Sequence, residues 1–435
     1  MNKTDLDLEK IGWEMHELIS ELYPIHRSIT GEGVRQTLAG LNQHIPVAVH
    51  EIPSGTQVFD WQVPAEWEIR DAYIKDKHGN RVIDYRESNL HVVTYSQPVN
   101  MTMAWRDLKK HLISLPDKPH WIPYRTSYFQ ESWGFCVSHK QLQELEEKSD
   151  QAYEVCIDAS FNPGSLTYGE MHLPGGSEDE ILIIANVCHP SLANDGLSGV
   201  AVSTYLAKYL SSRDRRYTYR FIFIPATIGA ISWLCKNEEQ LQKIKHGLIL
   251  NVLGDPGKST YKKSRRGNAE IDRVVSHVLE NSGTDYAIMD FEPIGYDERQ
   301  FCSPAFNLPV GCLMRTPNGR YPEYHTSADN LELVHPEYLA DSFAKCVEII
   351  NILENNQCFL NLNPKCEPQL GKRGLYRAHG FAESGEDLQQ AVLWVLNLSD
   401  GNNALLDIAE RSGFAFDLIK QAAELLLKHN LLREC

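Results

Sequence analysis

Metal-ligating side chains follow a strongly apolar run of this 435-residue sequence. The run 180–187 is followed by His189, and Asp195 lies six residues further on. His325 follows another strand-like run much later in the chain. Imidazole and carboxylate groups are the usual zinc ligands besides thiolate, and a site with three protein ligands keeps one position for water. These residues predict a site for one zinc ion. Whether a second metal ion also binds is left open by the sequence.

Each candidate ligand also has an ordinary structural explanation. A histidine at a strand end is most often a hydrogen-bonded structural residue, and an aspartate beside Gly196 is a common turn residue. The metal interpretation depends on the combination of the three residues. All of them are expected at one edge of a sheet, outside the carboxyl ends of the strands, where α/β sheets bind their ligands.

The elements that must bring these residues together alternate along the middle of the chain. Continuous apolar runs predict strands, and segments with helical spacing lie between them. Such alternation is typical of an α/β domain, in which a mostly parallel sheet has helices on both faces. We expect strands over 153–159, 180–187, 219–226, 247–254, 286–291 and 310–315, and helices over 198–212, 230–237, 268–282 and 336–355.

Residues 55–150 differ in composition from this α/β region. They hold five of the eight tryptophans and a hairpin signal at 75–85, where turn residues separate two strand-like runs. We therefore expect an inserted, mainly β domain with one helix over 105–115. Its tryptophans could offer stacking surfaces for sugars, although tryptophan is more often a core residue.

The two ends of the chain complete an organisation in three domains. Helical spacing over 5–22 and 34–43 assigns the N-terminal part to the α/β domain, which then comprises 1–54 and 151–360. A segment rich in Pro, Gly and Lys leads into three helical segments, which predict a winged-helix-like domain over 365–435. These helical segments are 387–398, 404–413 and 416–430.

Bulk composition restricts the compartment and the partners. The net charge of −16 and the pI near 5.5 argue against bulk attraction to nucleic acid or to anionic membranes. No apolar run reaches the roughly 18 residues of a membrane span, and the polar start MNKTDLDLEK does not resemble a signal peptide. Ten scattered cysteines without a C-x-x-C pair indicate reduced, buried thiols. We expect a cytoplasmic protein.

The terminal region 375–435 carries five basic and nine acidic residues, a net charge of −4. Because neutralisation of phosphates dominates DNA affinity, this charge disfavours DNA as a partner. The last helical segment is apolar along one side, which favours packing or a contact in a homo-oligomer. The apolar residues on that side are Leu418, Ile419, Ala422, Leu425 and Leu426.

Three motifs resemble those of the leucine-aminopeptidase-like zinc exopeptidases. HPSLANDGLSG contains His189 and Asp195, EYHTSADN contains His325, and GYDERQF resembles an Asp-containing segment of those enzymes. The resemblance implies that the strand-end His binds one metal, that the Asp bridges two metals and that the late His binds the second. With SGTQVFDWQVPAEWEIRDAYI and TYKKSR, the motifs also resemble the bacterial polysaccharide biosynthesis proteins with an aminopeptidase-like domain, over most of 25–340. That resemblance implies an inserted middle domain and a terminal winged helix.

The sequence departs from the peptidase pattern after the next strand. Those peptidases carry two adjacent glutamates there, one a general base and one a metal ligand, whereas this chain has Ala226 and Thr227. Neither side chain can take a proton from water. A further metal carboxylate expected near 251–257 could be Asp255, which falls later than the pattern requires. We therefore expect one zinc ion rather than a secure pair.

The missing glutamates leave the general base open. Glu323 lies two residues before His325 and would share its face if the segment is extended, but it could also be a surface carboxylate. Glu298, or Asp297 beside it, is the second candidate. Glu298 could instead form a structural ion pair with Arg299.

Further residues could bind the substrate. Lys263 and Arg265 belong to a basic cluster after a strand end and could receive a carboxylate or a phosphate, although a solvated charge run is the commoner explanation. Arg299 and Tyr324 could stabilise a developing oxyanion, and buried hydrogen-bonding roles are equally compatible with them.

These observations favour a zinc-dependent amide hydrolase of the aminopeptidase type, with zinc polarising the carbonyl and activating water. Its substrate would be a small peptide or, following the polysaccharide resemblance, an N-acylated or aminoacylated sugar. The alternative is a binding protein that retains zinc and is catalytically weak, which Ala226 and Thr227 favour. A DNA-binding regulator with an enzyme-derived sensor domain is disfavoured by the charge.

Overall fold

The computed structural model describes residues 6–148, 151–375 and 386–435. The chain forms two compact units, and helices α7 and α9 contribute residues to both. The larger unit comprises Thr4–Asp272 and Asp285–Ala344, and the smaller unit comprises Arg273–Thr284 and Lys345–Cys435.

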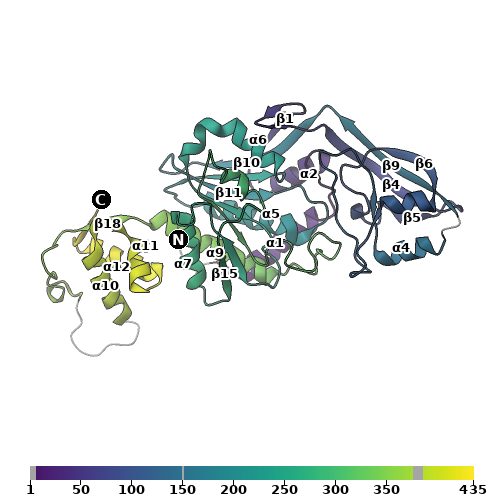
Figure 1. The fold of residues 1–435 in the computed structure, drawn as a ribbon. Helices are drawn as coiled ribbons and strands as arrows, with labels where there is room; N and C mark the ends of the chain where they lie inside the picture. Colours follow the sequence, from purple (N-terminus) through teal and green to yellow (C-terminus); the bar gives the residue numbers. More distant parts are fainter. Residues whose placement is uncertain (1–5, 149–150, 376–385) are drawn as a thin grey trace. The chain divides into compact units, whose positions relative to one another are not determined.

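An eight-stranded mixed sheet forms the centre of the larger unit (Figure 1). The four central strands β12, β11, β13 and β16 run parallel, and antiparallel pairs flank them on both sides. The predicted α/β fold with a mostly parallel sheet is therefore confirmed. Across the sheet the order is β1 (Ala48–Pro53), β10 (Ser165–Leu173), β12 (Thr218–Ile224), β11 (Glu180–Asn186), β13 (Ile244–Leu250), β16 (Val310–Met314), β14 (Ser259–Lys262) and β15 (Tyr286–Met289).

Helices pack on this sheet because its central strands are apolar on both faces. Leu182 and Ile224 share a buried cluster with Ile231 of α6, while the alternate strand residues Ile183 and Phe223 are also fully buried. The six helices expected for the α/β domain are present within a few residues. They are α1 (Leu8–Leu22), α2 (Glu32–Leu41), α5 (Gly199–Ser211), α6 (Ile228–Asn237), α7 (Glu270–Glu280) and α9 (Pro336–Asn355), with short helical pieces at Glu238–Lys243 and α8 (Glu298–Phe301).

A second, four-stranded antiparallel sheet corresponds to the expected inserted β region. The hairpin between β4 (Glu66–Lys75) and β5 (Arg81–Asp84) confirms the predicted turn. Strand β9 (Ala152–Asn162) pairs with β4 on one side and with β6 (Val99–Ala104) on the other. The assignment of 153–159 to the core sheet is therefore wrong, because both edges of β9 are hydrogen-bonded within the smaller sheet.

Shorter elements complete this region. The helix expected over 105–115 ends early, because α3 (Trp105–Leu108) continues only into a 3₁₀ turn at Lys109–His111. The unpredicted helix α4 begins at a capping box formed by Ser138 and Gln141, a signal that is visible in the sequence. The remaining pieces are β2 (Gln57–Val58), β3 (Trp61–Gln62), a 3₁₀ turn at Asn89–His91, β7 (Leu112–Ile113), β8 (Phe135–Cys136) and α4 (His139–Glu146).

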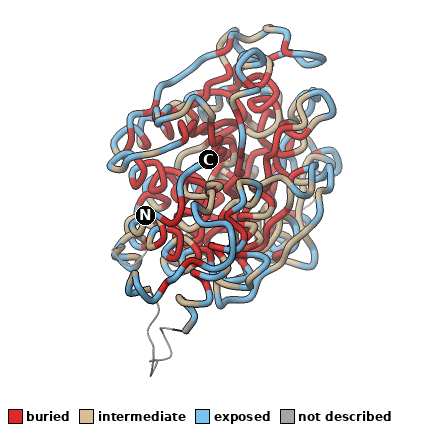
Figure 2. Tube along the Cα trace, turned by 90° about the vertical axis from the view of Figure 1, so that its left-hand side faces the viewer, coloured by how far each residue is buried: buried red, intermediate tan, exposed pale blue. Residues whose placement is uncertain are grey.

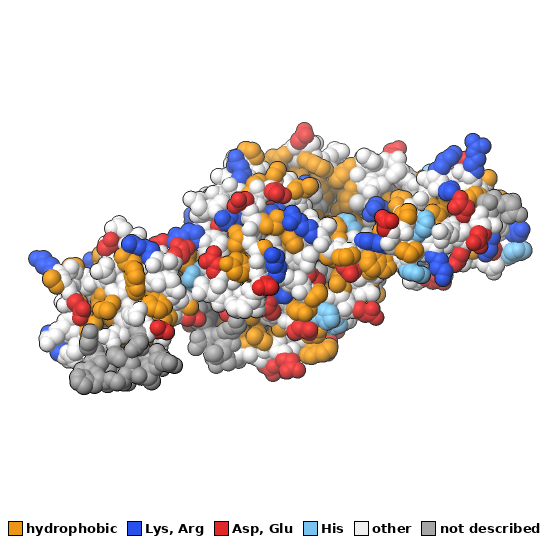
Figure 3. Space-filling view, turned by 60° about the horizontal axis from the view of Figure 1, so that its bottom comes forward, with side chains coloured by type: hydrophobic (Ala, Val, Ile, Leu, Met, Phe, Trp, Pro, Cys, Tyr) orange, Lys and Arg blue, Asp and Glu red, His pale blue; other side chains and the backbone are white. Residues whose placement is uncertain are grey.

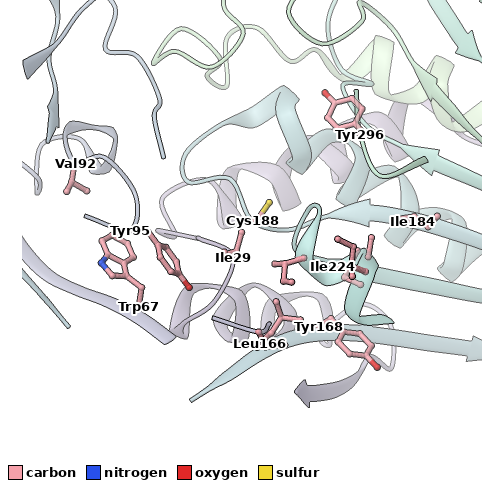
Figure 4. Close-up of a cluster of buried hydrophobic side chains, with 14 of the residues drawn as sticks. Ile29, Trp67, Val92, Tyr95, Leu166, Tyr168, Ile184, Cys188, Ile224 and Tyr296 are labelled. Carbon is pink, nitrogen blue, oxygen red and sulfur yellow. The ribbon is translucent and has the colours of Figure 1, made fainter. Parts of the chain in front are cut away.

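One buried apolar cluster joins the two sheets of the larger unit (Figure 4). Trp67 and Tyr95 come from the inserted region, and Ile184 and Ile224 come from the central strands. The rings of Trp67 and Tyr95 stack with their centroids 5.6 Å apart. Trp67 is thus a core residue, whereas Trp61 is 38% exposed. In Figure 2 the buried residues fill the interior, and exposed segments surround them.

The smaller unit contains the predicted helical module together with a three-stranded antiparallel sheet. Strand β17 (Cys358–Asn361) pairs with β18 and β19, so the sheet of the module begins before the expected boundary at residue 365. Residues 376–385 of the expected domain lie outside the described residues. The other elements are a 3₁₀ turn at Gly371–Arg373, α10 (Glu386–Leu398), β18 (Asp400–Ala404), α11 (Leu405–Ser412), α12 (Phe416–Lys428) and β19 (Leu432–Glu434).

Two further expectations concern cysteines and membranes. All ten cysteines are free thiols, and five of them are buried, while Cys366 and Cys435 are exposed. In the described part of the chain, no helix combines the length and the apolar character that a membrane crossing needs.

Candidate metal centre

His189, Asp195 and His325 meet beyond the carboxyl ends of strands β11 and β16. Each offers one ligating atom, and these atoms lie within 4.8 Å of one another. His189 Nδ1 lies 3.8 Å from Asp195 Oδ1, and His325 Nε2 lies 3.0 Å from Asp195 Oδ2. The Asp195 side chain is fully buried, whereas those of His189 and His325 are 13% and 29% exposed. The three predicted ligands therefore come together, and the group reaches solvent through its imidazoles.

A tight, irregular turn carries Asp195 back toward the end of β11. Between β11 and α5, the residues Ala193–Ser198 contain non-helical backbone at Asp195 and at Gly196, which has a φ of 116°. Glycine adopts such a φ without steric cost. A Cβ at Gly196 would also lie 2.9 Å from the backbone oxygen of Asn186. This glycine therefore permits the turn that brings the carboxylate beside His189.

Asp329 holds the backbone of this turn. Its carboxylate accepts hydrogen bonds from the backbone N–H groups of Asn194 at 2.6 Å and Asp195 at 3.0 Å, and from the Tyr321 hydroxyl at 3.0 Å. The Asn194 side chain in turn donates to Asp255 at 3.0 Å. Asp255, which the sequence suggested as a further metal ligand, is thus a hydrogen-bond acceptor behind the turn. Partners of this kind orient metal ligands.

Aromatic rings surround the two imidazoles. Tyr124 packs edge-on against His189 and His325, with centroid distances of 5.4 and 5.1 Å. Tyr324 stacks on His325 at 4.0 Å, and the Tyr296 hydroxyl donates to Asp195 Oδ1 at 3.2 Å. Sequence reasoning missed Tyr124, for which no local signal exists. It also missed Tyr296, although this residue lies within the GYDERQF motif.

Burial and neighbouring charges set the protonation of the group. Burial lowers the pKa of His189 to about 4, although the Asp195 carboxylate opposes this shift. Burial alone would raise the pKa of Asp195, but the two imidazoles and the Tyr296 hydroxyl outweigh it and hold the pKa below its ordinary value. Burial and the charge of Asp195 raise the pKa of Asp329 to about 7. At neutral pH, His189 is therefore neutral and Asp195 ionised, which are the ligating forms.

The residues present fit a divalent metal ion. Within the ranges that the structure describes, this is the one group of three His, Cys, Asp or Glu side chains close enough to share an ion. Two imidazoles and a carboxylate form a common zinc donor set. His189 Nδ1 is buried and has no hydrogen-bond partner among the described residues. Because an unsatisfied buried polar atom is costly, a ligated cation would remove a destabilising feature.

Comparison with known families identifies the chain. Residues 16–356 match the model of a domain of unknown function, DUF4910, and residues 357–434 match a winged helix-turn-helix model. The chain belongs to the DUF4910 family. The second match agrees with the predicted terminal winged helix.

A protein of Clostridium acetobutylicum named "Putative polysaccharide biosynthesis protein with aminopeptidase-like domain" is 50% identical over 433 residues, covering 100% of this chain and 99% of that protein. A crystal structure of a "putative peptidase" from the same organism has a TM-score of 0.93 at 49% identity, covering 99% of this chain and 98% of that one. The resemblance drawn from the motifs is confirmed. A zinc aminopeptidase from Bacillus subtilis has a TM-score of 0.57 at 14% identity, covering 79% and 94% of the two chains, which shows a likeness of fold alone.

In this DUF4910 chain the two predicted bases have different surroundings. Glu298 is fully buried and forms an ion pair with Lys262, which is also buried, rather than with Arg299. Lys262 Nζ donates in addition to the backbone oxygen of Ile294 at 2.7 Å. A carboxylate held by an internal cation is a poor base, so the geometry assigns Glu298 a structural role. Glu323 lies in a turn, so the expectation that it shares a face with a neighbour in an extended segment is wrong.

Two of the three predicted substrate-binding cations, Lys263 and Arg265, have ordinary surface partners. Lys263 lies 3.7 Å from Asp290, and the exposed Arg265 donates to Asn307 at 3.2 Å. Arg299 has a buried Nε without a hydrogen-bond partner in the described residues. Substrate binding by these three cations stays a prediction.

The end of the neighbouring strand β12 carries Ala226 and Thr227 in place of acids. Thr227 adopts a φ of 63° and a ψ of −76°, which is uncommon for a β-branched residue. Its N–H donates to Asp297 Oδ1 at 2.8 Å, and the Ala226 N–H donates to Cys188 Sγ at 3.2 Å. Asp297 also accepts from Asn186 Nδ2 at 2.8 Å, and burial raises the pKa of Asp297 to about 6. The backbone at the end of β12 is thus held in an unusual conformation, although neither Ala226 nor Thr227 has a side chain that could act as a general base.

Proposed function

We propose that this protein is a zinc-dependent amide hydrolase of the aminopeptidase type. Its substrate is a small peptide or an N-acylated or aminoacylated sugar. The convergence of His189, Asp195 and His325 within 4.8 Å carries the proposal. The aminopeptidase-like domain and the polysaccharide biosynthesis in the name of the Clostridium relative support the reaction type and the sugar alternative.

His189, Asp195 and His325 would hold the zinc ion, which when bound polarises a carbonyl and lowers the pKa of water. The other residues act around that group. Tyr296 orients Asp195 by donating a hydrogen bond to its carboxylate, and Asp329 orients it by accepting a hydrogen bond from its backbone N–H. Burial keeps the Tyr324 hydroxyl protonated by raising its pKa, so it remains a donor for a developing oxyanion.

Glu323 is the general base in this proposal, because Glu298 is occupied by Lys262. A second candidate function is favoured by Ala226 and Thr227, which lack acidic groups. In that case the protein retains zinc and binds an amide-bearing ligand but turns it over poorly.

Two measurements separate these functions. Elemental analysis counts zinc per chain, and a screen with aminoacyl-p-nitroanilides and N-acylated amino sugars measures turnover. We expect about one zinc per chain and turnover that is lost in His189→Ala and in Glu323→Gln but kept in the control Glu332→Gln. Zinc without turnover on any amide would favour the binding protein, and absence of zinc would reject both functions.

We further propose that the winged-helix module does not bind DNA and that the protein acts in the cytoplasm. In helix-turn-helix proteins the N-terminal end of the second helix meets the bases. Here that end of α12 is engaged within its own unit: the Phe416 N–H donates to His277 at 3.2 Å, and Asn351 donates to Asp417 at 2.8 Å. Acidic and basic side chains are also interspersed over the face drawn in Figure 3.

Fluorescence polarisation with random duplex DNA at low salt tests the absence of DNA binding. Affinity in the micromolar range or tighter would overturn it. Self-association of the chain stays a prediction, and the mass in solution measured by light scattering would decide it.

A further inference from the structure

A groove of about 360 Å³ opens in the inserted region of the larger unit. Concave sites of this size, lined by aromatic rings with a few polar groups, are typical of small-molecule binding. Its walls come from four separate segments of the sequence, so the groove exists only in the folded chain. The lining residues are Pro64, Ala65, Tyr95, Gln97, Ser127, Phe129, Gln130, Glu131 and Phe161.

Three aromatic residues line the groove: Tyr95, Phe129 and Phe161. Tyr95 is buried and meets Phe161 edge-on at 5.7 Å. Its hydroxyl donates to the backbone oxygen of Ala65 at 3.0 Å, which fixes the ring in place. Phe129, by contrast, is 51% exposed and contacts Trp61 at 5.2 Å. The groove therefore combines a fixed, buried ring with an open aromatic surface.

Backbone strain accompanies this arrangement. Tyr95 has a φ of 69° and Phe129 a φ of 62°, although bulky residues rarely adopt the left-handed region. Such conformations persist where the surrounding structure imposes them, and they cluster at binding sites. Tyr95 and Phe129 thus both have a strained backbone. Burial of the side chain does not offset this strain at Phe129, which is largely exposed.

Polar groups on the rim indicate the chemistry of a ligand. The side chains of Gln97, Gln130 and Glu131 line the groove, and no hydrogen bond to another described residue occupies them. Two primary amides and a carboxylate suit the hydroxyl and amine groups of a sugar, while an exposed ring such as Phe129 suits its C–H face. None of the described residues that line the groove is Lys, Arg or His, which disfavours a phosphorylated or acidic ligand.

A chain of tyrosines connects the groove with the metal group. Tyr128, next to Phe129, packs edge-on against Tyr95 at 5.3 Å. Its hydroxyl lies 3.1 Å from that of Tyr124, whose ring contacts both imidazoles. Two tyrosines in series, Tyr128 and Tyr124, thus connect the lining residue Tyr95 with the two imidazoles.

We propose that this groove is a saccharide subsite that binds an unphosphorylated amino-sugar residue, with Phe129 as stacking surface and Gln130 and Glu131 as polar contacts. Its connection with catalysis rests on the proposed function, because a saccharide subsite selects the sugar from the two substrate classes named there. The binding step itself needs neither zinc nor turnover, so it can be tested when no hydrolysis is seen.

Saturation-transfer NMR and titration calorimetry with glucosamine, N-acetylglucosamine and glucosamine 6-phosphate test the subsite on the full chain and on His189→Ala. We expect each unphosphorylated sugar to bind to His189→Ala with the same affinity as to the unmodified chain. Glucosamine 6-phosphate should bind at least about fivefold more weakly than glucosamine. Phe129→Ala should weaken binding about tenfold, and Gln130→Ala severalfold. Tyr286→Ala, which removes an aromatic residue 39% exposed elsewhere, should bind as the unmodified chain does.

Several outcomes would overturn the subsite. Unchanged sugar affinity in both Phe129→Ala and Gln130→Ala would exclude the groove, and no binding at millimolar sugar would exclude the ligand class. Binding of the dipeptide Ala-Phe that is lost in Phe129→Ala, without sugar binding, would assign the groove to an apolar peptide side chain instead. Circular dichroism of each variant identifies any loss of folding, and Trp61→Phe keeps an aromatic contact to Phe129 as a conservative comparison.

Discussion

The ends of two neighbouring parallel strands, β11 and β12, differ in the chemical groups that follow them. The end of β11 leads to His189 and Asp195, which lie together with His325. The end of β12 has Ala226 and Thr227, without acidic groups, yet Thr227 is held in an unusual backbone conformation. The comparison teaches that a group of candidate metal ligands can follow one strand while its neighbour, without acidic groups, ends in an unusual backbone conformation.

One segment contacts both strand ends. Tyr296 donates to Asp195 after β11, and Asp297 accepts the N–H of Thr227 after β12. Glu298, next along the chain, is anchored by Lys262. The GYDERQF motif is therefore a support shared by both strand ends.

The largest effect should come from removing a ligand at the end of β11. His189→Ala or His325→Ala should reduce bound zinc from about one ion per chain to near zero and lower any amide turnover by about 1,000-fold or more. Elemental analysis and the substrate screen measure both quantities. His335→Ala, at an exposed histidine, is the control. Zinc retained at full stoichiometry in both ligand variants would refute the assignment.

Breaking the shared support should mainly affect stability. Lys262→Met leaves the Glu298 carboxylate buried without a cation and should lower the free energy of unfolding by about 3–5 kcal/mol. Lys263→Met removes a half-buried cation from a pair with the exposed Asp290 and should change it by less than about 1 kcal/mol. Urea unfolding measures both variants. Equal effects would show that the buried pair has no special role.

Restoring acids at the end of β12 sharpens the comparison. If only side chains are missing there, Ala226→Glu/Thr227→Glu should raise amide turnover about 100-fold, because a general base contributes that order of magnitude. The matched variant Ala226→Gln/Thr227→Gln should not. If Ala226→Glu/Thr227→Glu binds zinc normally but gains no turnover, the absence of these two carboxylates does not limit turnover.

A smaller effect is expected from the support of Asp195. Tyr296→Phe removes one hydrogen bond to its carboxylate and should weaken zinc affinity about tenfold, within the range found for groups that hydrogen-bond to metal ligands. Competition with a chromophoric chelator measures this affinity, and Tyr286→Phe serves as control. Unchanged affinity would limit Tyr296 to packing.

The remaining prediction concerns pH. Because burial raises the pKa of Asp297 to about 6, the folded state keeps its proton while the unfolded state loses it above about pH 4. The contribution of Asp297 to the free energy of unfolding is therefore fully present below about pH 4 and is lost as the pH rises through about 6. The free energy of unfolding of the unmodified chain should fall by about 1–3 kcal/mol over this interval relative to Asp297→Asn. Parallel pH dependence in the two proteins would contradict the raised pKa.

Local sequence patterns predicted much of the fold and the ligand set. The apolar run at β11, the turn glycine after it and the late histidine motif were sufficient to select His189, Asp195 and His325. The same kind of pattern misassigned β9, because an alternating apolar strand does not reveal which sheet it joins. It also missed the turn at Glu323, whose backbone oxygen accepts a hydrogen bond from the N–H of Thr326.

By itself, the amino-acid sequence determined the order of strands and helices, the tight turn at Gly196 and the identity of the candidate metal ligands, because these depend on periodicity, backbone sterics and donor chemistry within a few residues. Only the tertiary structure decided which distant groups meet: Lys262 with Glu298, Tyr296 with Asp195, and Asp297 with the backbone of Thr227. Such pairings depend on how the sheet edge brings separate loops together, and no spacing along the chain encodes that distance.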